Sequence, residues 1–96
     1  MTMLTHQMRN GISDNVREMV SFINKVGVSN VKKYCQEKYP RTDFNKALLI
    51  IRSIAVMGYQ EAGYKHNVSR QCAEQTLKKI YKIAREAAEV DDGDKE

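Results

Sequence analysis

The sequence predicts an all-α fold, a small single-domain helical bundle of about five helices that contains a helix-turn-helix. Aliphatic residues recur at spacings of three and four along the chain, and no β-branched run alternates as a strand would. The only proline, Pro40, leaves long stretches free to form helices. Residues 61–77, "EAGYKHNVSRQCAEQTL", begin a helical pattern, break it and restart it at once. Ninety-six residues suffice for one hydrophobic core, so we expect one domain over residues 1–90.

The first helix is expected to follow a polar leader that contains His6. Ser13-Asp14 supplies side chains that suit an N-cap, and Gly27 ends the helix. The apolar residues of this stretch fall on one helical face, which should pack inward: Val16, Met19, Val20, Ile23 and Val26.

A second, shorter helix is expected between Ser29, as its N-cap, and Pro40, which stops it. Its inward residues are Val31, Tyr34 and Cys35, while Lys32, Lys33 and Lys38 point outward. The stretch "KKYCQEKYPR" alternates tyrosines with basic residues, so this N-terminal half is a candidate surface for a protein partner. The packing of an ordinary solvated helix explains the same pattern equally well.

The third helix opens at Thr42-Asp43 and closes at Gly58. It is apolar over more than half of its circumference, which is typical of a central, buried helix. The residues that make it so are Phe44, Ala47, Leu48, Ile50, Ile51, Ile54 and Ala55.

The stretch from about residue 59 to 80 has the pattern of a helix-turn-helix, in which two helices cross steeply around a short turn. Gly63 is small where the second helix crosses the first, and Asn67 tolerates the left-handed conformation that the turn needs. Val68 is expected to anchor the turn in the core, and Ser69 to cap the new helix. The inward residues of this second helix are Ala73 and Leu77.

Four polar residues remain on the outer side of the first turns of this helix, and we interpret them as DNA base-reading residues: Arg70, Gln71, Glu74 and Gln75. An arginine can bond guanine O6 and N7 at once, and a glutamine can pair with adenine N6 and N7. Glu74 would repel phosphate unless it accepts from cytosine N4 or orients Arg70, and we favour the orienting role. Without a DNA partner, all four would be ordinary solvated helix residues.

Residues that flank the expected groove-facing side are candidates for phosphate contacts, which set register but carry no sequence information. They are Tyr64, Lys65, Ser69, Lys78 and Lys79. The neighbouring His66 is interpreted as a half-buried turn residue and not as a ligand.

The apolar stripe of the last helix continues beyond the expected helix-turn-helix. Leu77 and Ile80 should be used by the core of the chain itself. Ala84, Ala87 and Val90 lie further out, where the helix of a second copy would be the easiest cover, so a dimer interface is expected there. A monomer in which the first helix covers this surface is the alternative.

The charge is strongly divided along the chain. The last eleven residues carry six of the twelve acidic residues and one of the sixteen basic ones, so residues 1–85 hold fifteen basic against six acidic residues, a net charge of +9. A basic body favours a polyanionic partner such as double-stranded DNA. Residues 91–96, "DDGDKE", have too little apolar surface to fold and are expected to form a disordered acidic tail.

The segment "NVSRQCAEQTLKKI" resembles the recognition segment of the KorA/TrfB-type transcriptional repressors of conjugative plasmids. "MGY" and "KHNVS" also resemble, more distantly, fimbrial regulators of the PapB type. The likeness covers residues 51–83. It implies sequence-specific operator binding by a dimer, with Arg70 and Gln75 at base-reading positions. The chain departs from the first family with Asn67 where glycine is usual and Ala73 where valine is usual.

We therefore expect a DNA-binding transcriptional regulator, a repressor that inserts the helix starting at Ser69 into the major groove of a palindromic operator as a homodimer. The alternative is a protein-interaction module that uses the helix-turn-helix as a scaffold to bind a polymerase subunit or another regulator. An enzyme is not expected, because two isolated histidines and scattered carboxylates offer no nucleophile, base and orienting group.

No cofactor or metal is expected, since Cys35 and Cys72 stand far apart with no paired histidines. No apolar run approaches the roughly 20 residues that a membrane span needs. We expect a soluble, cytoplasmic protein with reduced cysteines and no membrane partner.

Overall fold

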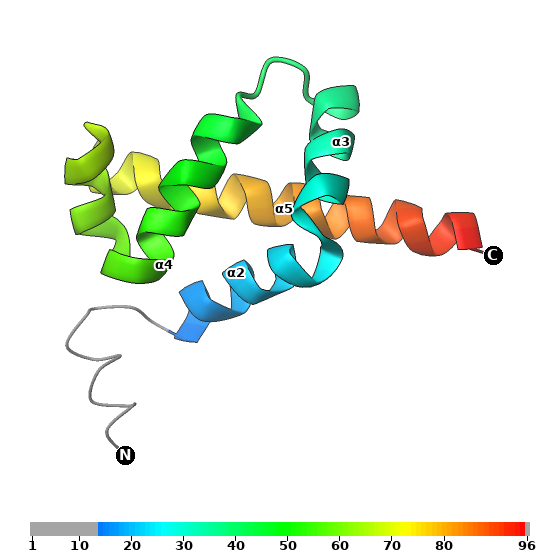
Figure 1. Ribbon diagram of the computed structural model, residues 1–96, viewed down its shortest axis with the longest axis horizontal. Coiled ribbons are helices and arrows are strands. Elements are labelled where there is room, and N and C mark those ends of the chain that lie inside the picture. The colour runs from blue at the N-terminus through cyan, green and yellow to red at the C-terminus, as the bar shows by residue number, and fades with distance from the viewer. Residues whose placement is uncertain (1–13, 96) are drawn as a thin grey trace.

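The computed structural model describes residues 14–95, and the side chains of residues 14–90. Over residues 14–95 the chain forms four helices and no strand: α2 (Asp14–Val26), α3 (Val28–Lys38), α4 (Phe44–His66) and α5 (Arg70–Lys95) (Figure 1). The predicted all-α class is confirmed. Ser13, the expected cap of the first helix, and His6 lie outside the described residues.

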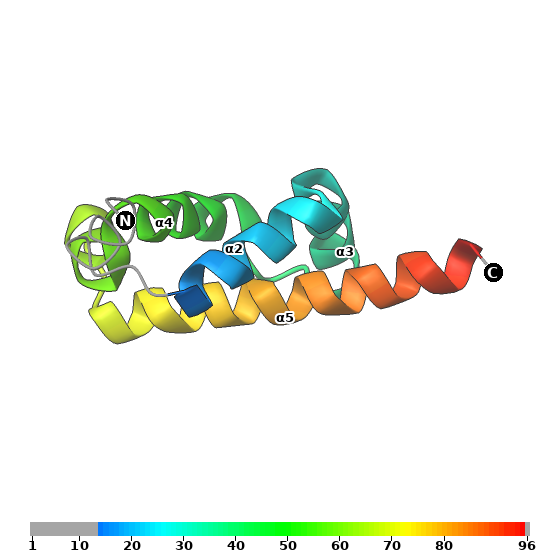
Figure 2. The same cartoon turned by 90° about the horizontal axis from the view of Figure 1, so that it is seen from below.

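The long helix α5 is the element on which the fold is built. It packs against each of the other helices, and against α4 most extensively. Figure 2 shows α2, α3 and α4 on one side of α5. The opposite side of α5 is therefore left without a covering helix in the described part of the chain.

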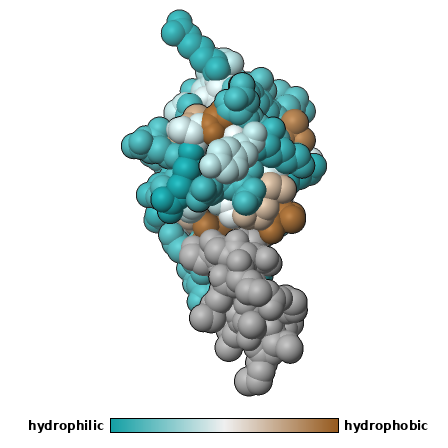
Figure 3. Space-filling model, turned by 90° about the vertical axis from the view of Figure 1, so that its left-hand side faces the viewer, coloured by the Kyte–Doolittle hydropathy of each residue, from teal (hydrophilic) through white to brown (hydrophobic). Residues whose placement is uncertain are grey.

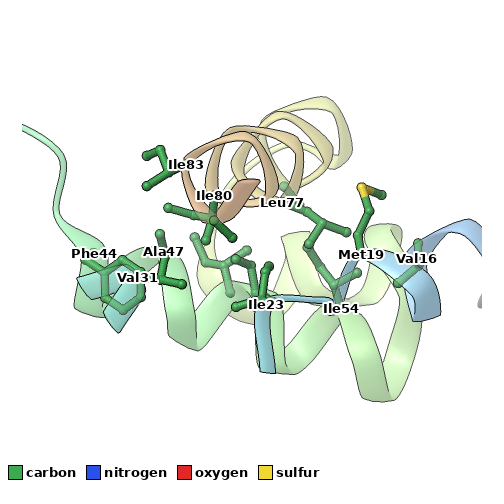
Figure 4. Close-up of a cluster of buried hydrophobic side chains, with 14 of the residues drawn as sticks. Val16, Met19, Ile23, Val31, Phe44, Ala47, Ile54, Leu77, Ile80 and Ile83 are labelled. Atoms are coloured by element: carbon green, nitrogen blue, oxygen red, sulfur yellow. The ribbon is translucent and has the colours of Figure 1, made fainter. Parts of the chain in front are cut away.

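The core lies between α5 and the three helices above it. The side chains that meet there come from all four helices, as Figure 4 shows. Burial of such aliphatic groups is the main term that holds a small helical domain together. The labelled core residues are Val16, Met19, Ile23, Val31, Phe44, Ala47, Ile54, Leu77, Ile80 and Ile83, each at most 8% exposed.

The junction of α2 and α3 differs from the expectation. Ser29 does not cap α3; the N-cap is Gly27, with φ 105°, a conformation that L side chains rarely adopt. The side-chain amide of Asn30 donates instead to the carbonyl of Val26, over 2.8 Å. Because Gly27 can turn the chain at once, α3 starts at Val28, two residues earlier than a cap at Ser29 would allow. Its predicted end before Pro40 is confirmed.

Helix α4 begins as predicted, because the carboxylate of Asp43 accepts from the backbone N–H of Lys46 over 3.1 Å. Gly58, where this helix was expected to close, has a non-helical backbone, φ 87° and ψ 174°, so a first helical stretch ends at a kink there. A second stretch follows and runs to His66, and α4 comprises both. With α4 taken as one element, the described chain has four helices, against the expected count of about five. Glycine adopts this positive φ without the strain that a Cβ would add.

Two tyrosines, one in α3 and one directly after it, hold α5 at Glu86. The hydroxyls of Tyr34 and Tyr39 both donate to Oε1 of Glu86, over 3.1 and 2.8 Å. Desolvation first, and then the hydrogen bond to Glu86, raise the pKa of Tyr34. The hydrogen bond to Glu86 is the first cause that raises the pKa of Tyr39. Each phenol is thus kept protonated as a donor to the carboxylate.

Residues 91–95, which were expected to be part of a disordered tail, have a helical backbone. Helix α5 continues past Val90 to Lys95. The run Glu86–Val90 consists of residues that mostly favour helix, and adding a turn to a helix already held by packing is easier than starting one. Glu96 lies outside the described residues.

Candidate functional site

The connection between α4 and α5 is a tight turn with a left-handed residue. Asn67 has φ 59° and ψ 42°, the left-handed conformation. Its backbone N–H donates to the carbonyl of Tyr64 over 3.3 Å, and the N–H of Val68 donates to the carbonyl of Gly63 over 2.9 Å. These bonds satisfy the last carbonyls of α4 and let the chain reverse within three residues.

At Gly63 the backbone of the turn that leads into α5 folds back against α4. A Cβ built at this position would lie 2.7 Å from the carbonyl oxygen of Val68 and 3.3 Å from the carbonyl carbon of Ser69. Real Cβ atoms essentially never approach a backbone oxygen that closely. The turn therefore excludes every side chain at position 63, as expected for the small crossing residue.

Helix α5 starts directly after this turn. The hydroxyl of Ser69 accepts from the N–H of Cys72 over 3.0 Å, which is the expected N-cap. Ala73 and Leu77 are fully buried and anchor the first turns of α5 to the core. Their positions determine which side of α5 faces outward.

The outward side of α5 carries polar and basic residues. Arg70, Gln71, Gln75, Lys78 and Lys79 are all exposed, so the predicted base-reading and phosphate-contacting residues of this helix lie on an open surface. The uncovered side of α5 in Figure 2 is the side opposite Ala73 and Leu77. Figure 3 looks onto the end of the molecule where α4 turns into α5, and hydrophilic residues cover most of the described surface in that view.

Glu74 differs from the expectation. Its Oε2 lies 3.1 Å from Nζ of Lys78, one turn ahead, so the carboxylate pairs with Lys78 and does not orient Arg70. The pair is solvent-exposed, and such pairs contribute little stability. Its consequence is local, because a lysine neutralises the acidic side chain beside the glutamines of the outward face.

Charged residues on one flank of the outward face act electrostatically on Tyr59 of α4. Burial is the main cause that raises the pKa of Tyr59, and the charge of Glu74 raises it further, while Lys78 and Arg70 lower it. Arg70, Glu74 and Lys78 are therefore the charges of α5 that act on this part of α4.

The other flank faces the start of α4 and holds basic residues that were not predicted as part of a site. Arg41 and Lys46 join Lys79 around a cleft of about 300 Å³ that also contacts Cys72 and Thr76. Thr76 donates its hydroxyl to the carbonyl of Cys72 over 2.9 Å, so it is turned back on its own helix. The sequence shows two basic residues, Arg41 and Lys46, near Thr42-Asp43. No pattern in the neighbouring sequence indicates that they lie beside α5.

A third basic residue that the sequence analysis did not assign to the site is Lys82, which is exposed. It lies seven residues after Gln75, on the same side of α5 as Gln71 and Gln75. Helical periodicity alone would have found it.

The two remaining phosphate candidates, Tyr64 and Lys65, are exposed near the end of α4. Tyr64 is 72% exposed and accepts a long hydrogen bond, 3.4 Å, from the side-chain amide of Gln60. His66 is half-buried, as expected, and its Nε2 lies 2.7 Å from the hydroxyl of Ser53. This contact ties the end of α4 to the part that precedes Gly58.

The expected dimer interface is corrected. Ala84 and Ala87 are 0% and 7% exposed in the single chain, so the chain covers them itself, and only Val90, 48% exposed, remains available. The reach of α2 and α3 along α5 accounts for this, since both helices pack against it. The alternative, in which the chain's own helices cover the stripe, holds for the two alanines.

Among the described residues, no group of three or more histidine, cysteine or carboxylate side chains is placed to hold a metal ion. Cys35 is buried, and burial raises the pKa of its thiol, while Cys72 is exposed on α5. Within the same part of the chain, every helix is too short or too polar to cross a bilayer.

Comparison of the chain with protein-family models, with curated proteins and with solved structures finds no match.

Proposed function

We propose that the second half of α4 and the start of α5 form a helix-turn-helix, and that the protein is a sequence-specific DNA-binding transcriptional regulator. The observation that supports this most directly is the close approach of the turn and of the start of α5 to Gly63, where a Cβ would lie 2.7 Å from the carbonyl oxygen of Val68 and 3.4 Å from the backbone nitrogen of Arg70. A close crossing followed by a left-handed turn residue and a capped helix is what this motif requires.

The chemistry of the outward face supports DNA as the partner. Gln71 and Gln75 lie one turn apart on the exposed side of α5, with amide groups suited to adenine, and Arg70 suits guanine. Lys78, Lys79 and Lys82 follow along the same helix and supply charge for phosphate contacts. The first turns of α5 would lie in the major groove of double-stranded DNA.

The basic residues around the cleft between α5 and the start of α4 extend this proposed surface toward α4. Arg41 and Lys46 lie beside Lys79 and would contact the phosphates of one strand when α5 occupies the groove. Asp43, which also lines this cleft, is engaged as the cap of α4. The flank therefore adds positive charge on one side of the helix that would read the bases.

The regulator would act as a homodimer on a palindromic operator, since a single helix-turn-helix reads few base pairs and a second copy supplies the second half-site. The contact between copies would use a surface other than Ala84 and Ala87. The resemblance to the KorA/TrfB-type repressors supports repression as the direction of regulation.

The test is selection of random-sequence duplex DNA on the purified full-length protein at about 150 mM salt, followed by sequencing of the bound fraction. Recovery of a palindromic motif is expected, and its half-site spacing reports how the two recognition helices are separated. Recovery of unselected sequence, with affinity that vanishes as salt rises, would leave only charge attraction and would refute the proposal.

A further inference from the structure

The face of α4 that points away from α5 carries two exposed aliphatic side chains. Leu49 is 55% exposed and Val56 is 69% exposed. Both line one groove of about 460 Å³, together with Met57. Large aliphatic side chains exposed side by side cost solvation free energy, and such patches mark interaction sites when they gather at one place.

The spacing of these residues makes a continuous stripe. Leu49, Arg52 and Val56 lie at i, i+3 and i+7, opposite the buried Ile50 and Ile54. Figure 2 shows α5 beneath α4 and none of the described helices on the other side. The stripe is therefore open to a partner along two turns of α4.

The groove is held in shape by a contact between distant parts of α4. The hydroxyl of Ser53 and Nε2 of His66, 2.7 Å apart, both belong to residues that line it. This bond joins the two stretches that meet at the Gly58 kink. The wall formed by the end of α4 is thus positioned before any partner arrives, which lowers the entropic cost of binding.

The charge around the groove selects the kind of partner. Its polar rim includes Arg52, Lys65 and His66, and no carboxylate lines it in the described part of the chain. A second copy that met the groove with the same face would bring the same basic residues against it, and like charges oppose such a contact. An acidic partner would gain both the apolar contact and the pairing of its carboxylates with Arg52 and Lys65.

We propose that this groove is a docking site for an amphipathic helix of an acidic partner protein. Aliphatic residues of that helix, spaced at i, i+3 or i+4, and i+7, pack on Leu49 and Val56, and flanking Asp or Glu residues face Arg52 and Lys65. The proposal does not depend on DNA binding, because the groove lies on the side of α4 turned away from α5.

The experiment selects a display library of random peptides of about 16 residues, long enough for four helical turns, on the full-length protein. We expect enrichment of acidic peptides with the aliphatic spacing above. An enriched peptide is then synthesised, and its affinity for the parent and for variants is measured by fluorescence anisotropy.

The double substitution Leu49→Ser with Val56→Ser should weaken peptide binding at least about tenfold. Arg52→Glu should weaken it as well, and binding to the parent should fall as salt rises. Val90→Ser is the matched control, since Val90 is similarly exposed but lies on α5, and it should bind like the parent. Circular dichroism checks that each variant keeps its helices.

Three results would overturn the proposal. One is the absence of enriched peptides, as expected when residues 1–13 occupy the groove. The second is enrichment of peptides without acidic residues, or of peptides that bind the double variant as tightly as the parent. The third is a dimer in sedimentation analysis that the double variant converts to monomer, which would make the groove a self-association surface. DNA selection by the double variant should match the parent, so failure here leaves the proposed function untouched.

Discussion

The backbone of Val68 lies so close to Gly63 that a methyl group on Gly63 would stand 2.7 Å from the Val68 carbonyl oxygen. The same two residues are joined by a hydrogen bond of 2.9 Å from the N–H of Val68 to the carbonyl of Gly63. The turn between α4 and α5 is therefore bonded and sterically closed at one point. The orientation of α5 relative to the end of α4 depends on this contact.

We expect Gly63→Ala to lower the free energy of unfolding by about 2 kcal/mol, because overpacking against a backbone atom costs roughly 1–3 kcal/mol and forces the turn to move. Alanine favours a helix over glycine by about 1 kcal/mol, so an open site would give the opposite sign. Urea denaturation followed by circular dichroism measures the change. Glu61→Ala, an exposed position of the same helix, is the control and should have little effect. A stabilised Gly63→Ala variant would show that the backbone of Val68 does not approach position 63 this closely.

Position 67 tests the left-handed turn. Asn67 has φ 59°, a conformation that costs most L residues roughly 1–2 kcal/mol. Asn67→Ala should lower the free energy of unfolding by about 1 kcal/mol, whereas Asn67→Gly should leave it equal or higher. The comparison of the two variants in thermal denaturation separates conformation from contacts, since both remove the same side-chain amide. Equal destabilisation by both variants would contradict a left-handed Asn67.

Base recognition is tested at Gln75, which is exposed on the outward face of α5. Gln75→Ala should relax specificity at one base pair of each half-site, a loss of about 1–3 kcal/mol of discrimination, while affinity for unrelated DNA stays the same. Competition binding with single-base operator variants measures it. Gln36→Ala, equally exposed on α3, should leave the selected motif unchanged. A full motif retained by Gln75→Ala would place base recognition elsewhere.

Phosphate contacts are tested at both sides of the cleft beside α5. Lys79→Ala and Lys46→Ala should each weaken binding to all sequences alike and reduce the slope of log K against log salt by about 1. Lys33→Ala on α3 removes the same charge from an exposed position away from the cleft, and its slope should match the parent. If Lys46→Ala behaved like Lys33→Ala, the DNA backbone would not reach the start of α4.

The tyrosine pair on Glu86 predicts a pH dependence. Burial and the hydrogen bonds to Glu86 raise the pKa values of Tyr34 and Tyr39 in the folded chain above the ordinary value of 10.0. The folded state therefore favours the protonated phenols, so their stabilisation is complete below the unfolded pKa and is lost as pH rises through the folded pKa. Unfolding by urea at pH values on either side of about 10 should show a steeper loss of stability for the parent than for the Tyr34→Phe, Tyr39→Phe double variant. Parallel losses in the two proteins would mean that the phenols carry none of this dependence.

Local signals in the sequence predicted most helix ends and the turn between α4 and α5, but not the start of α3 or the end of α5. The caps at Asp43 and Ser69, the stop before Pro40, the left-handed Asn67 and the inward Ala73 and Leu77 were all predicted. Each depends on residues within about four positions, where hydrogen-bond geometry and helical periodicity leave few choices.

Only the tertiary structure decided which side of each helix is covered, because this depends on the position and length of helices that are distant in the sequence. Ala84 and Ala87 continue an apolar stripe, yet only the packing of the chain's own helices on α5 shows that no partner is needed to bury them. Glu74 had two cationic neighbours at helical spacing, and the folded chain pairs it with Lys78. Lys46 lies far from Lys79 along the chain, and only the crossing of α4 over α5 brings them to one cleft. Burial and charge convergence are properties of the assembled helices, whereas capping and turn conformation belong to short segments.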